Sequence, residues 1–196
     1  IMITDYPEFC DITLDQRPIL HPLFKRYDRG VSEMTFANIF LFRHDDQHAH
    51  RIARIGEDNY VFIGRDRDQP VFMLPFDLPE KKLLDDLFAR YHQAKALHSD
   101  QARQLADLGY HVWENRDDFD YLYSRQALAE LRGNKYHRKK NLVNKFVKEF
   151  EAAGRPLVPD LHHDALYILE TWSGANDIIG DYSAAREAIE LSLIHI

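Results

Sequence analysis

The chain lacks several features that mark the commoner protein classes. Its 196 residues include a single cysteine, which leaves no disulfide framework and predicts a cytoplasmic protein. No apolar run approaches the ~20 residues needed to cross a bilayer, so no transmembrane segment is expected. The first residues lack the basic start and apolar stretch of a signal peptide. The 8 glycines are isolated, and no Gly-x-Gly is present to form a phosphate-binding nest of the kind that holds coenzyme A.

The chain does contain enough apolar material to fold and an uneven distribution of charge. Hydrophobic residues make up 45%, which suffices for one good core or two small ones. The net charge of −7 argues against binding of nucleic acid over the whole surface. However, 7 of the 25 Lys and Arg lie between Arg132 and Lys148 with no acidic residue among them, which leaves 18 elsewhere against 32 Asp and Glu. An otherwise acidic chain has therefore collected positive charge on one segment.

Periodicity and turn residues predict an α+β fold. Three strand-like segments separated by polar turns favour an antiparallel meander, and two aromatic segments follow as further strands. These five strands are expected at 49–55, 59–64, 70–75, 110–113 and 119–123. A short helix is expected within 31–43, with Ser32 as its N-cap. Further helices are expected from Pro79, at 99–109, 125–131 and about 135–153, from 160 or 164, and from 181.

The expected helix at about 135–153 is amphipathic and basic. One face is apolar and carries Leu142, Val143, Phe146, Val147 and Phe150. Cations gather on the opposite face and at the first turn, where unpaired N–H groups favour a bound anion. We predict a site for tRNA or lipid phosphate formed by Lys135, His137, Arg138, Lys139, Lys140, Asn141 and Lys145. The alternative is a solvated charged face, which normally has acidic i,i+4 partners; the run itself contains none.

Three segments have the character of sequence motifs. The first is Ser-Glu-Met-Thr-Phe-Ala-Asn-Ile-Phe-Leu-Phe-Arg at 32–43. The second is Arg-Asp-Asp-Phe-Asp-Tyr-Leu-Tyr at 116–123, and the third is Gly-Asn-Lys-Tyr-His-Arg-Lys-Lys-Asn-Leu-Val-Asn-Lys-Phe at 133–146. In this order they resemble motifs of the phosphatidylglycerol lysyltransferase C-terminal-domain family, with Asp118 in place of an asparagine of the family's second motif. The resemblance spans roughly 18–190.

This resemblance implies a domain organisation. Members of the family consist of two consecutive GNAT-like domains, that is, domains like the acyl-CoA N-acyltransferases, with a mixed sheet and flanking helices. It implies a first GNAT-like domain at 1–131, a basic connecting helix at 132–155 and the start of a second domain at 156–190. Residues 191–196 match the translation of a sequencing-adapter end, so we expect them to be non-native and the second domain to be cut short.

The resemblance also implies a function. The characterised branch moves an aminoacyl group from charged tRNA to phosphatidylglycerol, so aminoacyl-tRNA is the expected donor and no other cofactor is expected in this fragment. The family's motifs nearest the reaction centre belong to the second domain and are absent here, so no catalytic residue is assigned. Expected partners are tRNA, an anionic phospholipid head group and the remainder of the second domain. Two alternatives stay open: a non-catalytic module that binds RNA or anionic lipid, and a coenzyme-A-dependent N-acyltransferase.

Two further groups of residues are interpreted as structural. The histidines His44, His48 and His50 fall in an expected exposed loop without acidic or cysteine partners at ligand spacing, so a metal site is not expected. The aromatic residues Trp113, Tyr121 and Tyr123 are expected mainly in the core, the alternative being that they stack on a base or sugar.

Overall fold

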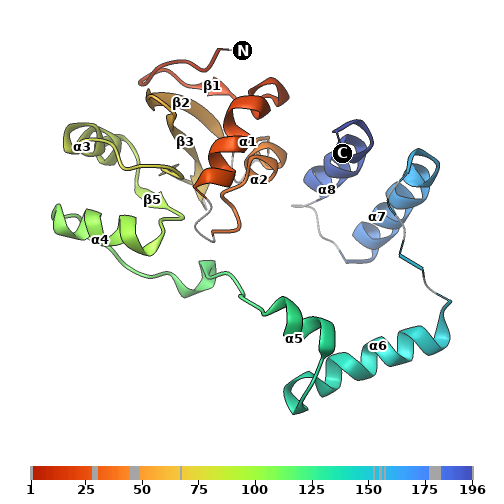
Figure 1. Cartoon of the computed structure of the whole chain (residues 1–196). Coiled ribbons are helices and arrows are strands. Elements are labelled where there is room, and N and C mark those ends of the chain that lie inside the picture. Colours follow the sequence, from red (N-terminus) through yellow and green to blue (C-terminus); the bar gives the residue numbers. More distant parts are fainter. Residues whose placement is uncertain are drawn as a thin grey trace.

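The computed structural model describes residues 2–27, 31–44, 49–66, 68–151, 153–154, 156, 158–176 and 182–195. Its centre is a five-stranded sheet in the order β1-β2-β3-β4-β5 (Figure 1). The strands are β1 (Cys10–Asp11), β2 (Arg51–Gly56), β3 (Asn59–Asp66), β4 (Gln69–Met73) and β5 (Gln93–Lys95). The first four run antiparallel to their neighbours, and β5 joins β4 in parallel. The predicted meander and the mixed α+β class are confirmed, whereas the finer GNAT-like assignment stays a prediction.

The turns of the meander are formed by residues that tolerate left-handed backbone. Asp58 has a φ of 51° between β2 and β3, and Asp68 has a φ of 70° between β3 and β4. Asp is among the few residues that adopt positive φ at little cost, because its short side chain bonds to nearby backbone. These two positions therefore define where the chain reverses.

The sheet is covered on both faces. The helices α1 (Arg17–Arg26) and α2 (Phe36–Leu41) pack on one face, and α3 (Lys81–Arg90) and α4 (Ser99–Asp107) supply the core of the other (Figure 1). Side chains of β3 alternate between the two cores: Tyr60 and Phe62 face α1 and α2, while Val61 lies with α3 and α4. A strand buried on both sides needs a continuous apolar run, which explains the sequence Tyr-Val-Phe-Ile at 60–63.

The predicted cap of the short helix is one turn too early. The N-cap of α2 is Thr35, whose hydroxyl accepts a hydrogen bond from the Asn38 N–H at 3.1 Å. Phe36, Ile39 and Phe40 are buried on one side of it, as predicted. Ser32, the expected cap, instead bonds to a residue 88 positions away. A serine hydroxyl can either cap a helix or bond to a residue far away in the sequence. The local sequence pattern does not distinguish these two interactions.

After α4 the chain leaves the sheet and forms four further helices. They are α5 (Arg125–Glu130), α6 (His137–Glu149), α7 (His162–Asn176) and α8 (Tyr182–His195). The basic helix is shorter than predicted, because a 3₁₀ turn (Asn134–Tyr136) precedes it and Phe150 is already extended. The last helix returns to α2, where Arg43 makes two hydrogen bonds to Glu187, at 2.9 and 2.8 Å (Figure 1). Leu191 packs against the core of the first face.

The prediction of two aromatic strands at 110–113 and 119–123 is wrong. Neither segment joins the sheet, and a 3₁₀ turn (Arg116–Asp118) separates them. Aromatic residues favour strands only where a neighbouring strand accepts their backbone, and β5 already occupies that edge of β4. The core position expected for Trp113, Tyr121 and Tyr123 is wrong as well, since these side chains are exposed.

No α-helix in the described ranges is both long and apolar enough to pass through a bilayer. The division of the chain into a connecting helix at 132–155, the start of a second domain at 156–190 and a non-native end at 191–196 stays a prediction.

Candidate functional site

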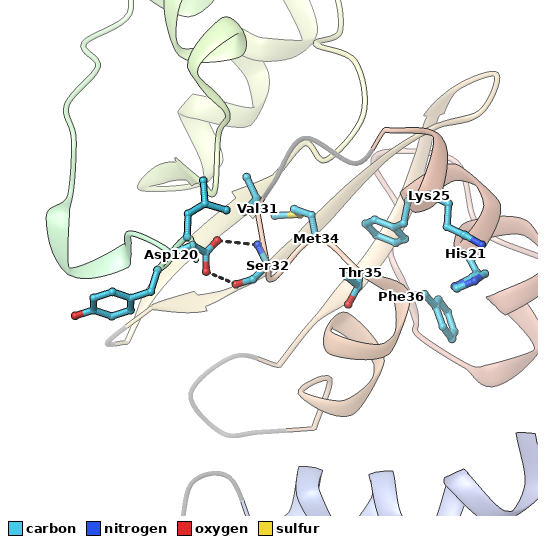
Figure 2. Close-up of a pocket in the computed structure, with 11 residues that line it drawn as sticks. His21, Lys25, Val31, Ser32, Met34, Thr35, Phe36 and Asp120 are labelled. Atoms are coloured by element: carbon cyan, nitrogen blue, oxygen red, sulfur yellow. Dashed lines mark hydrogen bonds between the residues drawn. The ribbon is translucent and has the colours of Figure 1, made fainter. Parts of the chain in front are cut away.

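A cavity of about 640 Å³ opens where two of the three resemblance motifs meet (Figure 2). Residues 31–36 form one wall and residues 120–122 approach from the opposite side, while α1 supplies a third wall. The volume is within the range of small-molecule sites, roughly 300–1,000 Å³. Its lining is His21, Phe24, Lys25, Val31, Ser32, Met34, Thr35, Phe36, Asp120, Tyr121 and Leu122.

The two motif segments are joined by Ser32 and Asp120. The Ser32 N–H donates to one carboxylate oxygen of Asp120 at 2.9 Å, and its hydroxyl donates to the other at 2.5 Å (Figure 2). The hydroxyl hydrogen bond, followed by the backbone one, lowers the pKa of Asp120 below its usual value of 3.8. The carboxylate is therefore ionised at neutral pH, and the pair holds residues 120–122 against the cavity.

The remaining lining is apolar at the base and carries Lys25 and His21 on the α1 side. Phe24 and Phe36 are 5% and 3% exposed and present their residual surface to the cavity. Lys25 and His21 lie one turn apart on α1, on the side away from Asp120 (Figure 2). Within the described part of the chain, neither side chain has a hydrogen-bond or ion-pair partner.

The predicted phosphate-binding residues form a second candidate site, separate from the cavity. Lys135 lies in the 3₁₀ turn before α6, and the other six residues lie on α6 itself. All seven are exposed, and none of them lines the cavity. Lys135 places its ammonium 4.9 Å from the centre of the Tyr136 ring, a cation–π contact. The structure thus brings the seven together along one helix, with their cations accessible to solvent.

The expectation that this basic run has no acidic partners is wrong at two positions. Lys145 Nζ lies 3.9 Å from Glu149, and Arg132 Nε lies 3.1 Å from Glu130. Both acids sit just outside the run, where the helix and the preceding turn bring them within reach. Such exposed pairs contribute on the order of 0.2–1 kcal/mol, so they leave the positive character of the helix largely intact.

The apolar face of α6 is exposed along with the basic one. Its members are 49–68% exposed: Leu142, Val143, Phe146, Val147 and Phe150. The amphipathic pattern predicted from the sequence is confirmed, but in the described part of the chain it is not used for core packing.

Comparison with known proteins decides the family. A family model described as the C-terminal part of phosphatidylglycerol lysyltransferase matches residues 24–192, which is most of the chain. The chain belongs to this family. No curated protein matches it. A solved structure, a conserved protein of unknown function from Bacteroides thetaiotaomicron VPI-5482, is similar with 26% identity and a TM-score of 0.76. The similarity covers 97% of this chain and 68% of that one.

Ser32 and Asp120 were not predicted as site residues, although both lie in segments that carry the family resemblance. The two residues lie 88 positions apart, so no local sequence pattern predicts that they form a hydrogen bond. The one indication in the sequence was that both residues lie in family motifs, at 32–43 and 116–123, to which no chemical role was assigned.

We predict that Ser32→Ala raises the pKa of Asp120 towards 3.8, because the hydroxyl donor, the largest cause of the lowered pKa, is lost. A carboxyl with a lowered folded-state pKa stabilises the fold above its unfolded value and loses that contribution as the pH falls through the folded value. In the native chain the contact should therefore persist at pH 3.8 and open only as the pH falls through the lowered pKa of Asp120. NMR titration of the Asp120 carboxyl measures the shift; an identical titration curve in the variant would contradict it.

One of the three histidines, His50, is placed differently from the expected exposed loop. His50 is buried at 9% exposure, and its Nδ1 lies 3.4 Å from the Ile39 carbonyl oxygen. His48 lies outside the described residues, and His44 is exposed. In the described ranges, no three His, Cys, Asp or Glu side chains are grouped so that they could hold a metal ion.

Proposed function

We propose that the chain is part of an aminoacyltransferase that uses charged tRNA, with α6 as a contact for tRNA phosphates. The observation that carries the proposal is the exposed basic helix, in a member of the phosphatidylglycerol lysyltransferase C-terminal family. Duplex nucleic acid presents a dense row of phosphates, and lysine and arginine on one helix can follow such a row. The positive end of the α6 dipole adds to the attraction for anions.

The reaction that this function requires is a simple acyl exchange. An acceptor hydroxyl or amine would attack the carbonyl carbon of the aminoacyl ester, forming a new C–O or C–N bond. The bond to the tRNA ribose oxygen would break, and the acceptor's proton would move to that oxygen. The chain's share, in our proposal, is to bind and orient the donor, which alone can supply a large part of the rate gain. The catalytic groups would belong to a second GNAT-like domain that begins within 156–190 and packs against the first.

We propose to test the donor contact with the double variant Arg138→Glu and Lys139→Glu. The variant should bind tRNA about tenfold more weakly, because two phosphate contacts are lost. For the same reason the negative slope of the logarithm of the binding constant against the logarithm of the salt concentration should become shallower by about 1.5. Filter binding over a salt series measures both quantities. The matched control is Lys82→Glu, an exposed lysine on α3 remote from α6, which should leave the slope unchanged.

A second candidate function is supported by the exposed apolar face of α6. A basic amphipathic helix can lie at the surface of an anionic membrane without any catalysis. Sedimentation with phosphatidylglycerol vesicles separates the two: a double variant that loses vesicle binding but keeps its affinity for tRNA would favour the lipid module and overturn the tRNA proposal.

A further inference from the structure

Two exposed surfaces of the chain are apolar and carry opposite charge. One is α6, and the other is the segment 113–123 between α4 and α5, which lies outside the sheet and the helices that cover it (Figure 1). We propose that two copies of this chain form a dimer in which α6 of each copy packs against segment 113–123 of the other. The inference does not depend on tRNA, and it adds a partner that the proposed function does not assign.

The apolar part of segment 113–123 is centred on two tyrosines. The rings of Tyr121 and Tyr123 are stacked with their centres 6.3 Å apart, so both lie on one side of the segment. Leu122 between them is 98% exposed, and Trp113 and Phe119 are more than half exposed. Large apolar side chains gathered on a surface in this way are typical of a protein–protein contact.

The same segment is acidic. It contains four Asp and Glu and one arginine, and Asp118 forms an ion pair with Lys95 at 3.7 Å. The carboxylates of Glu114 and Asp117 are exposed and have no hydrogen-bond or ion-pair partner within the described part of the chain. Two uncompensated negative charges therefore lie close to the exposed aromatic side chains.

The helix α6 combines apolar side chains with charge of the opposite sign. Lys139 and Lys140 precede Val143 by four and three positions, so both lie beside the exposed apolar face of the helix. Neither ammonium has a partner among the described residues. Arg138 and Lys148 point away from this face, so they stay accessible to phosphate when the apolar face is covered.

A second copy of the chain fits both surfaces. Within one chain neither surface covers the other, since their apolar side chains are about half exposed or more, and α5 and the 3₁₀ turn at 134–136 lie between them. Two α6 helices would repel each other, whereas α6 and segment 113–123 attract. Each copy carries one surface of each kind, so two copies related by a twofold axis satisfy all four surfaces and the assembly closes. The two equal contacts double the area buried in the dimer.

The first test is the mass of the 196-residue chain in solution. Sedimentation over a concentration series should show a monomer–dimer equilibrium that weakens as salt is added, because salt screens exposed charges. Leu122→Ser should weaken the dimer about tenfold by removing apolar area from both contacts, and its side chain has no packing to lose in the single chain. The matched control Lys82→Glu, on α3, should leave the equilibrium unchanged.

A charge exchange between the two surfaces identifies the partner. Lys139→Glu/Lys140→Glu places like charges at both contacts of its own dimer, and Glu114→Lys/Asp117→Lys does the same. Each variant alone should therefore dimerise about tenfold more weakly than the native chain. In a mixed dimer of the two variants, both contacts again join opposite charges. An equimolar mixture should therefore dimerise about as strongly as the native chain.

Several outcomes would overturn the proposal. A chain that stays monomeric throughout the concentration series would remove the dimer. Variants that remain monomeric when mixed would show that α6 packs on its own chain or on a different protein. Species heavier than a dimer would show that the contact does not close about a twofold axis. Because the dimer is measured without tRNA, failure of this inference leaves the filter-binding test of the proposed function unaffected.

Discussion

Replacing Phe76 by alanine is expected to lower the free energy of unfolding by about 3–5 kcal/mol, the range found when a buried aromatic ring is removed. Phe76 follows β4 and is 1% exposed. Its ring is surrounded by three others, with centre-to-centre distances of 5.1 Å to Phe24, 5.4 Å to Tyr27 and 6.2 Å to Tyr60. The deletion removes the hydrophobic contribution of the ring and leaves a void among side chains that belong to a helix and a strand and cannot all collapse into it.

Urea unfolding followed by circular dichroism measures this loss. Phe119→Ala is the matched control, because that ring is 53% exposed and its removal should change stability by no more than about 0.5 kcal/mol. A loss below about 1 kcal/mol in Phe76→Ala would show that the aromatic cluster is looser than its ring distances indicate.

The second large effect is expected at Gln101, a buried polar residue that joins α4 to the end of β4. Its side-chain nitrogen donates to the carbonyl oxygens of Leu74 at 2.7 Å and Phe76 at 3.0 Å, and the residue is 3% exposed. Gln101→Ala removes the donor and leaves two buried carbonyl groups without it, which should cost about 2–4 kcal/mol. The same denaturation experiment applies, and Gln104→Ala, an exposed position on the same helix, should be close to neutral.

The variant Gln101→Glu provides an independent check on the cause. A protonated carboxyl can still donate one hydrogen bond to a carbonyl oxygen, whereas an ionised carboxylate can donate none. The deficit of this variant should therefore grow as the pH rises from about 4 to 7. A deficit that does not change with pH would mean that lost packing, and not lost donation, accounts for the effect.

The parts of the fold that the sequence predicted are those specified by nearby residues. The meander follows from apolar runs bounded by Asp-containing turns, and α3 and α4 follow from apolar spacing with recognisable ends. The three-residue strand β5 was missed because Gln93, Ala94 and Lys95 have no strand-forming side chains, and only pairing with β4 makes them a strand. The opposite error arose at 119–123, where strand-forming side chains have no strand to pair with.

Of the two candidate sites, one is specified by nearby residues and the other only by the tertiary fold. The basic face of α6 depends on residues within one helix and was therefore predictable as a pattern, although Glu149 and Glu130 show that its surroundings were not. The cavity depends on α1, on residues 31–36 and on residues 120–122, which only the tertiary fold brings together. No spacing in the sequence encodes that meeting, and Gln101 likewise carries no mark that distinguishes it from the exposed Gln104.

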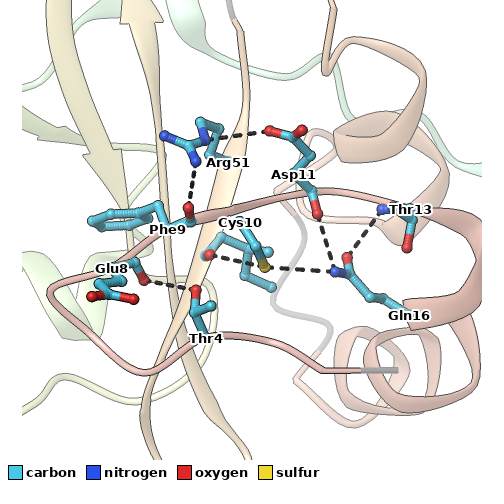
Figure 3. A network of polar contacts seen from close by, with 9 residues as sticks. Thr4, Glu8, Phe9, Cys10, Asp11, Thr13, Gln16 and Arg51 are labelled. Atoms are coloured by element: carbon cyan, nitrogen blue, oxygen red, sulfur yellow. Dashed lines mark hydrogen bonds and ion pairs between the residues drawn. The ribbon is translucent and has the colours of Figure 1, made fainter.

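The arrangement of the N-terminal segment restricts how this protein can self-associate. At one edge of the sheet, β1 has two residues, and Arg51 of the neighbouring strand bonds to the Phe9 carbonyl and pairs with Asp11 at 3.4 Å (Figure 3). Gln16 also occupies the carbonyl of Asp11. At the other edge, β5 has three residues. Such short edges, one of them charged and partly occupied, offer a foreign strand almost no template, so fibril-like growth through the sheet is disfavoured at either end.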